Sequence, residues 1–115
     1  KKYVYLRKKN YQEVYNRLKK NKNYKYKILP LKPSFIPWRF NIFFKNNNDR
    51  NFVMRELLKN KIKISSWYSG LDIFFNKDKK LKNSEYVSKS ILNIWINEES
   101  TSIYRNKVVN FILKI

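Results

Sequence analysis

The spacing of apolar residues changes period several times along these 115 residues, and this alternation constrains the fold more than any other feature. Near the N-terminus the apolar side chains recur at the intervals of one helix face: Tyr11, Val14, Tyr15 and Leu18. Over residues 38–45 they alternate instead, with Phe40, Ile42 and Phe44 on one side, as in a strand. The chain therefore alternates between helices and strands.

The same patterns predict the order of the remaining elements. A helix over residues 1–20 is followed by a short extended piece at 26–31, and Pro30, Pro33 and Pro37 then exclude a helix before the strand at 38–45. Three further helices are expected: residues 50–60 with Asp49 as N-cap, a short one capped by Asn83 or Ser84, and a last one capped by Ser100 or Thr101. Strands are expected at 62–67 and 93–96.

Each predicted helix has a face that should pack inward. The expected inward residues are Val53, Met54, Leu57 and Leu58 in the second helix, Val87, Ile91 and Leu92 in the short one, and Tyr104, Val108, Phe111 and Ile115 in the last, with Val109 and Ile112 beside them. Helices interspersed with strands indicate an α/β or α+β domain with a small, mostly antiparallel sheet covered by helices. The length fits a single domain over residues 1–115.

The composition excludes several kinds of chemistry. There is no Cys and no His, so disulfide frameworks, Cys/His zinc sites, Fe–S clusters and Cys or His nucleophiles are absent from the chain. The formal net charge is +19, but 21 lysines stand against 6 arginines, and the chain has no Ala and one Gly. This bias toward A/T-rich codons weakens the charge as an indication of a nucleic-acid partner, which would favour Arg.

Several local strings, taken in order, resemble the C-terminal small domain of DegT-type aminotransferases, which are pyridoxal-phosphate enzymes acting on sugar nucleotides. Tyr15 and Leu18 match the opening helix, and residues 28–30 match a strand containing Pro. Residues 38–42 match a strand that starts with an aromatic residue, and residues 49–62 match a helix led by Arg. Lys61 stands where the family usually has Gly, and residues 67–70 keep the Tyr of a later element but not its His or Pro.

The resemblance implies a fold, a parent protein and an activity. It implies the small domain of an aspartate-aminotransferase-fold enzyme, preceded by a large domain and forming a homodimer in the cytoplasm. The parent would transfer an amino group from an amino acid to a keto-sugar nucleotide in surface-polysaccharide biosynthesis. Pyridoxal phosphate would be bound mainly by the large domain, so this chain is expected to hold no catalytic, cofactor-binding or metal-binding residue and to be inactive alone.

Three residues are candidates for binding the substrate. By the resemblance, Trp67 and Tyr68 end a strand that reaches the cleft, where the indole could stack on the substrate and the phenol could donate a hydrogen bond. Arg39 is a candidate bidentate partner for a carboxylate or phosphate. The alternatives are aromatic residues that only pack the sheet, and a solvated or ion-paired arginine at its edge.

A basic nucleic-acid-binding module is the competing functional hypothesis. The basic first helix and the alternating Tyr and Lys of residues 24–27 could contact phosphates and stack on bases. However, no recognised nucleic-acid motif is present and the lysines are spread along the whole chain.

No membrane partner is expected, because no apolar run approaches the roughly 20 residues of a membrane span.

Overall fold

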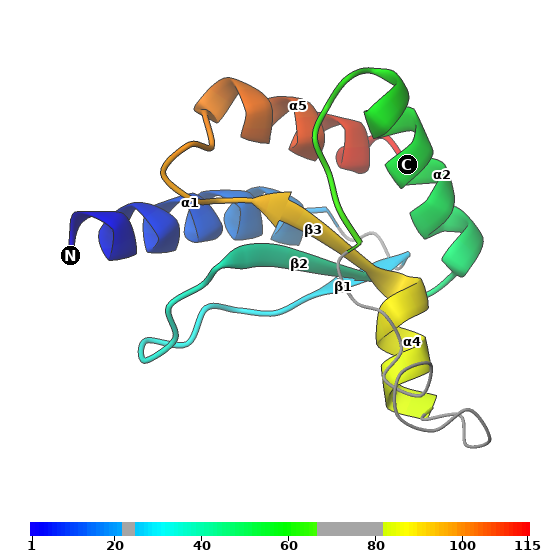
Figure 1. Cartoon of the computed structure of the whole chain (residues 1–115), viewed down its shortest axis with the longest axis horizontal. Coiled ribbons are helices and arrows are strands. Elements are labelled where there is room, and N and C mark those ends of the chain that lie inside the picture. The colour runs from blue at the N-terminus through cyan, green and yellow to red at the C-terminus, as the bar shows by residue number, and fades with distance from the viewer. Residues whose placement is uncertain (22–24, 67–81) are drawn as a thin grey trace.

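A three-stranded antiparallel sheet lies at the centre of the computed structural model, which describes residues 1–21, 25–66 and 82–115. Its strands are β1 (Tyr26–Ile28), β2 (Arg39–Phe44) and β3 (Ile91–Trp95), in the order β1-β2-β3 (Figure 1). The helices of the described residues are α1 (Lys2–Lys19), α2 (Asn47–Lys59), α4 (Lys82–Ser90) and α5 (Ser102–Leu113). The predicted α+β class with a small antiparallel sheet is confirmed.

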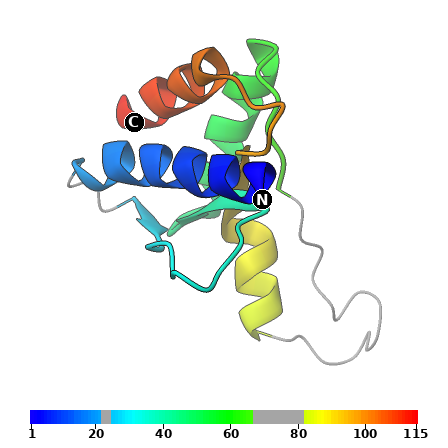
Figure 2. The same ribbon diagram turned by 90° about the vertical axis from the view of Figure 1, so that its left-hand side faces the viewer.

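The helices are distributed unequally over the two faces of the sheet. Helices α1, α2 and α5 lie together on one face, whereas α4 extends on the other side from the end of the sheet where β3 begins (Figure 2). The alternation of β2 explains this arrangement, because Phe40, Ile42 and Phe44 are completely buried and point to one face. They form the core with residues of the three covering helices: Val14, Leu18, Val53, Leu57, Val108, Val109 and Ile112.

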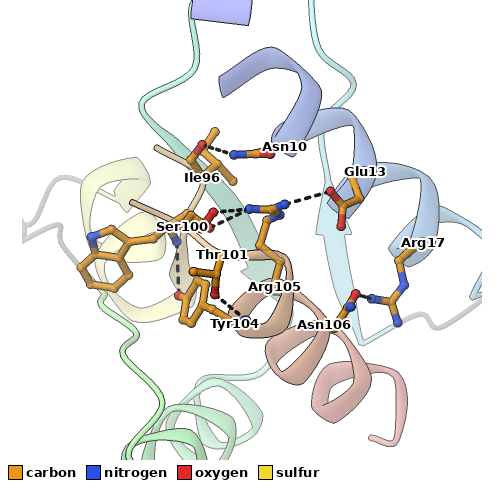
Figure 3. Close-up of polar contacts among 10 residues, drawn as sticks. Asn10, Glu13, Arg17, Ile96, Ser100, Thr101, Tyr104, Arg105 and Asn106 are labelled. Atoms are coloured by element: carbon orange, nitrogen blue, oxygen red, sulfur yellow. Dashed lines mark hydrogen bonds and ion pairs between the residues drawn. The ribbon is translucent and has the colours of Figure 1, made fainter. Parts of the chain in front are cut away.

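Polar side chains fix α5 against α1 at the start of α5. The guanidinium of Arg105 is buried, donates to the backbone oxygen of Ser100, and lies 3.1 Å from the carboxylate of Glu13 on α1 (Figure 3). One turn further along α1, Arg17 donates to the side-chain oxygen of Asn106 at 2.7 Å. A buried charge that is paired and hydrogen-bonded avoids most of the desolvation penalty, so this arrangement fixes the position of α5.

The starts of α2 and β3 differ from the sequence prediction. Helix α2 begins at Asn47, because the side chain of Asn46 accepts from the backbone N–H of Asn48 at 2.8 Å and acts as the N-cap in place of Asp49. Ile91 was predicted to be helical, but α4 ends at Ser90 and Ile91 begins β3. The guanidinium of Arg50 donates to the backbone oxygens of Ser88 and Ile91, which satisfies carbonyls at this helix end.

Two predicted inward faces also need correction. Leu58 is exposed on α2, where Val53 and Leu57 form the buried face. On α5 the predicted Val108, Val109 and Ile112 are buried together with Arg105, whereas the predicted Tyr104, Phe111 and Ile115 are only partly buried beside them. Leu92, predicted on a helix, is fully buried in β3.

The predicted strand at 62–67 is largely absent from its described part, residues 62–66. Only Ser65 pairs, through one antiparallel bridge to Asn93 on the edge of β3.

Helix α2 ends in a hydrogen-bonded turn that requires a left-handed residue. The N–H of Ile62 donates to the oxygen of Leu57, and that of Lys61 to the oxygen of Leu58, both at 2.9 Å, which is a Schellman motif. Lys61 sits at its left-handed position with φ 58°, where the Cβ of a non-glycine residue costs about 1 kcal/mol.

Replacing Lys61 with Gly should therefore raise the free energy of unfolding by about 0.5–1 kcal/mol, since glycine adopts this conformation without the Cβ clash. Lys59→Gly, in the last turn of α2, is the matched control and should lower it by about 1 kcal/mol. Chemical denaturation of both variants measures the difference. Equal destabilisation by the two substitutions would contradict the assignment of strain to Lys61.

Candidate functional site

Arg39 lies in a stack of three side chains where β2 begins and β3 ends. Arg39 pairs in register with Trp95, so both side chains project from the sheet face opposite Phe40. The guanidinium carbon of Arg39 lies 3.8 Å from the centroid of the Trp95 ring and 4.7 Å from that of Trp38. We call Trp38, Arg39 and Trp95 the arginine stack.

The stack holds a charged group between two aromatic surfaces. Each cation–π contact contributes about 0.5–2 kcal/mol, depending on how far the cation is desolvated. Burial lowers the pKa of Arg39, while the neighbouring Tyr104 acts to raise it, and an arginine remains protonated throughout the physiological range. Contact with two rings restricts the plane of the guanidinium, and a fixed plane is what bidentate recognition of a carboxylate or phosphate requires.

A small cavity adjoins the stack on the side of Trp95. Its volume is about 190 Å³, and its lining residues are Lys63, Trp95, Asn97, Glu99, Ser100 and Tyr104. The hydroxyl of Tyr104 donates to the backbone oxygen of Lys63 at 2.7 Å and accepts from the backbone N–H of Trp95 at 3.3 Å. Tyr104 thus connects α5 both to β3 and to the segment 62–66.

The electrostatic environment keeps this hydroxyl protonated. Burial raises the pKa of Tyr104 to about 12, although the hydrogen bond with the Trp95 backbone and the charge of Arg39 both act to lower it. The neutral phenol can therefore donate and accept at the same time at any physiological pH.

The structure describes one of the three substrate-binding candidates. Arg39 lies in the stack, whereas Trp67 and Tyr68 fall outside the described residues. Trp95 and Tyr104, the neighbours of Arg39, were not among the predicted site residues. The pairing of Arg39 with Trp95, 56 positions later in the chain, depends on the register between two strands, which the alternation within either strand does not reveal.

The part of the chain that the structure describes shows neither a metal-binding cluster nor a membrane-spanning helix. It holds no group of three or more acidic residues that could bind a metal ion, in a chain without His or Cys. In the same residues no helix is both long and apolar enough to span a bilayer.

The fold is shared with proteins of known structure, aminotransferases among them. The aminotransferase TlmJ from Streptoalloteichus hindustanus superposes with a TM-score of 0.83 at 12% identity, over 98% of this chain and 31% of that one. The sugar aminotransferase CalS13 from Micromonospora echinospora gives 0.77 at 17% identity, again over 98% and 31%. NtdA from Bacillus subtilis, solved with bound cofactor PMP, gives 0.80 at 13% identity, over 98% and 29%.

These likenesses concern the fold. No protein-family model matches the sequence, and no curated protein matches it. The chain spans about 30% of the length of these matched proteins. The predicted resemblance to DegT-type aminotransferases is confirmed as a likeness of fold, and a DegT DnrJ EryC1 StrS aminotransferase from Brucella abortus also matches, with a TM-score of 0.75.

The raised pKa of Tyr104 predicts an alkaline weakening of the fold. The unfolded chain loses this proton near pH 10 and the folded chain near pH 12, so the contribution is present below pH 10 and lost as the pH rises through 12. Tyr104→Phe should flatten the fall of the unfolding free energy in this window, as measured by denaturation at several pH values. Tyr26→Phe, at another tyrosine whose pKa burial raises, should flatten it less. A Tyr104→Phe profile parallel to the wild type would contradict the assignment.

Proposed function

We propose that residues 1–115 are the C-terminal small domain of a pyridoxal-phosphate-dependent aminotransferase. The observation that carries the proposal is the fold: two aminotransferases superpose on 98% of the chain with TM-scores of 0.83 and 0.77, although their sequences are at most 17% identical to it. The chain accounts for about 30% of such enzymes, so a large N-terminal domain would supply the rest. None of these neighbours supports the nucleic-acid alternative.

The reaction would transfer an amino group from an amino acid to a keto-sugar nucleotide, within a cytoplasmic homodimer that serves surface-polysaccharide biosynthesis. One matched structure supports the substrate class, since CalS13 from Micromonospora echinospora is a sugar aminotransferase.

The described residues do not fit a cofactor site of their own. Lysines that form a Schiff base are activated by desolvation or by a neighbouring cation. Over residues 1–21, 25–66 and 85–115 the lysines are exposed, apart from a half-buried Lys8 that donates to the backbone oxygen of Pro33. We therefore assign the cofactor to the large domain and give this chain a role in binding the substrate.

Within this role, Arg39 binds an anionic group of the substrate. The two indoles fix its plane, and its partial burial strengthens its attraction for a carboxylate or phosphate. Trp67 and Tyr68 remain candidates on the basis of the sequence, for stacking on the substrate and for a hydrogen bond to it.

The role of Arg39 can be tested in the parent enzyme. Arg39→Met should raise the KM for the substrate bearing the anionic group by about 10- to 100-fold, since a charge-assisted hydrogen bond contributes about 1.5–3 kcal/mol. Arg39→Lys, which keeps the charge without the planar fork, should recover only part of this. Arg55→Met, on the exposed face of α2, should leave the KM unchanged.

Steady-state kinetics with separate variation of amino donor and sugar nucleotide would identify which substrate Arg39 contacts. A wild-type parent without aminotransferase activity would overturn the proposed function. An active parent whose Arg39→Met variant keeps both KM values would overturn only the role of Arg39.

A further inference from the structure

The edge of the sheet next to the arginine stack is interrupted at a defined point. Ser65 and Asn93 exchange two backbone hydrogen bonds across the outer edge of β3, with N···O distances of 2.7 and 3.4 Å. In an antiparallel ladder the next pair to exchange hydrogen bonds lies two residues away on each strand. Here that pair is Lys63 and Trp95.

Side-chain hydroxyls occupy the positions of those two missing ladder bonds. The hydroxyl of Tyr104 lies between the partners of the first bond, because it accepts from the N–H of Trp95 and donates to the oxygen of Lys63. In place of the second, the hydroxyl of Ser100 donates to the oxygen of Trp95 at 2.7 Å. Tyr104 and Ser100 therefore replace the backbone partner that Trp95 would find in a continuous strand. The cavity of about 190 Å³ lies where the two segments separate.

The same register explains the close contact between Trp95 and Arg39. The backbone groups of Asn93 and Trp95 share one orientation, since they are two residues apart, and both are directed away from β2. Arg39 and Trp95 are therefore a pair without mutual hydrogen bonds, the kind of antiparallel pair whose side chains lie closer together. The position of the indole over Arg39 then depends on the groups that hydrogen-bond the Trp95 backbone on the side away from β2, which are the hydroxyls of Tyr104 and Ser100.

The Tyr104 side chain that bonds the Trp95 backbone is itself held in a fixed position. Tyr104 lies in the first turn of α5, and its N–H is capped by the hydroxyl of Thr101 at 3.1 Å. The adjacent Arg105 donates to the backbone oxygen of Ser100, and Figure 3 shows these residues together at the start of the helix. The position of α5 is thus transmitted to Trp95 through two hydroxyl groups.

We propose that Tyr104 is a positioning residue for Arg39. Its hydroxyl takes the place of the ladder hydrogen bond between Lys63 and Trp95, holds the sheet edge open, and fixes the indole that sets the plane of the Arg39 guanidinium. The assignment of Arg39 to anion binding rests on the proposed function, whereas the control of its position by Tyr104 does not.

Removal of the Tyr104 hydroxyl should disturb Trp95 in one of two ways. In Tyr104→Phe, Lys63 and Trp95 can close into a direct ladder bond, which moves Trp95, or they keep two unsatisfied backbone groups, which leaves Trp95 unrestrained. Either route loosens the contact between Arg39 and Trp95, whereas the contact of Arg39 with Trp38 stays. Asn46→Ala is the control for stability alone, because loss of this distant N-cap costs about 1 kcal/mol without touching Trp95.

The first measurement follows the side-chain signals of Arg39 by NMR, in protein labelled at arginine and assigned by comparison with Arg39→Lys. In the wild type the two indole rings should shift the Arg39 signals upfield. Tyr104→Phe should move them toward the position of the exposed Arg55, and Ser100→Ala should move them in the same direction by less. Asn46→Ala should leave them in place.

An unchanged Arg39 signal in both hydroxyl variants, or an equal change in Asn46→Ala, would overturn the proposal. Ser100→Ala decides the matter if Tyr104→Phe does not fold.

The second measurement is the affinity for inorganic phosphate and for 2-oxoglutarate, as probes of the two anionic groups, in the native protein. Tyr104→Phe should weaken the binding of whichever probe the wild type binds by about 10-fold, whereas Asn46→Ala should not. Equal affinities of Tyr104→Phe and wild type would overturn the positioning of a binding group. A wild type that binds neither probe but shows the NMR changes would support the control of Arg39 by Tyr104 and overturn the anion-binding role of Arg39.

Discussion

The alternation of β2 is the constraint on which the rest of the structure depends. Because Phe40, Ile42 and Phe44 must be buried under α1, α2 and α5, the residues between them are forced to the opposite face. A slip of one residue would exchange the two faces, so the apolar side chains that form the core also determine where Arg39 points. The packing of the core therefore also determines the orientation of the candidate site residue Arg39.

Helix α5 connects that core to the site. Its buried face packs on the sheet, Arg105 joins it to Glu13 of α1, and its first turn carries Tyr104. A residue in the core layer can therefore determine the geometry of a charged group on the far face, through hydrogen bonds rather than direct contact. Functional groups are commonly held by such supporting contacts, and displacements near 1 Å can matter.

Much of the fold could be predicted from the sequence, because α1 and β2 have clear periodicities and large buried faces. Predictions failed where competing local preferences differ little in energy: Asn46 was a cap as good as Asp49, and Ile91 and Leu92 suit either a helix or a strand. The alternation over 62–66 does suit a strand, but tertiary hydroxyls displace its pairing. Arg39 was found as a lone arginine beside a tryptophan. Its second aromatic partner follows from a register that only the folded chain reveals.

The measurement that tests the account most directly is made on the native polypeptide that contains this sequence. Its mass and its visible absorption, before and after an amino donor is added, report whether it is part of a larger cofactor enzyme. We expect a chain about three times as long as this one, from the 31% coverage of its structural neighbours, with a pyridoxal-phosphate band that changes when the donor is added. A native chain of 14.2 kDa without such a band would contradict it.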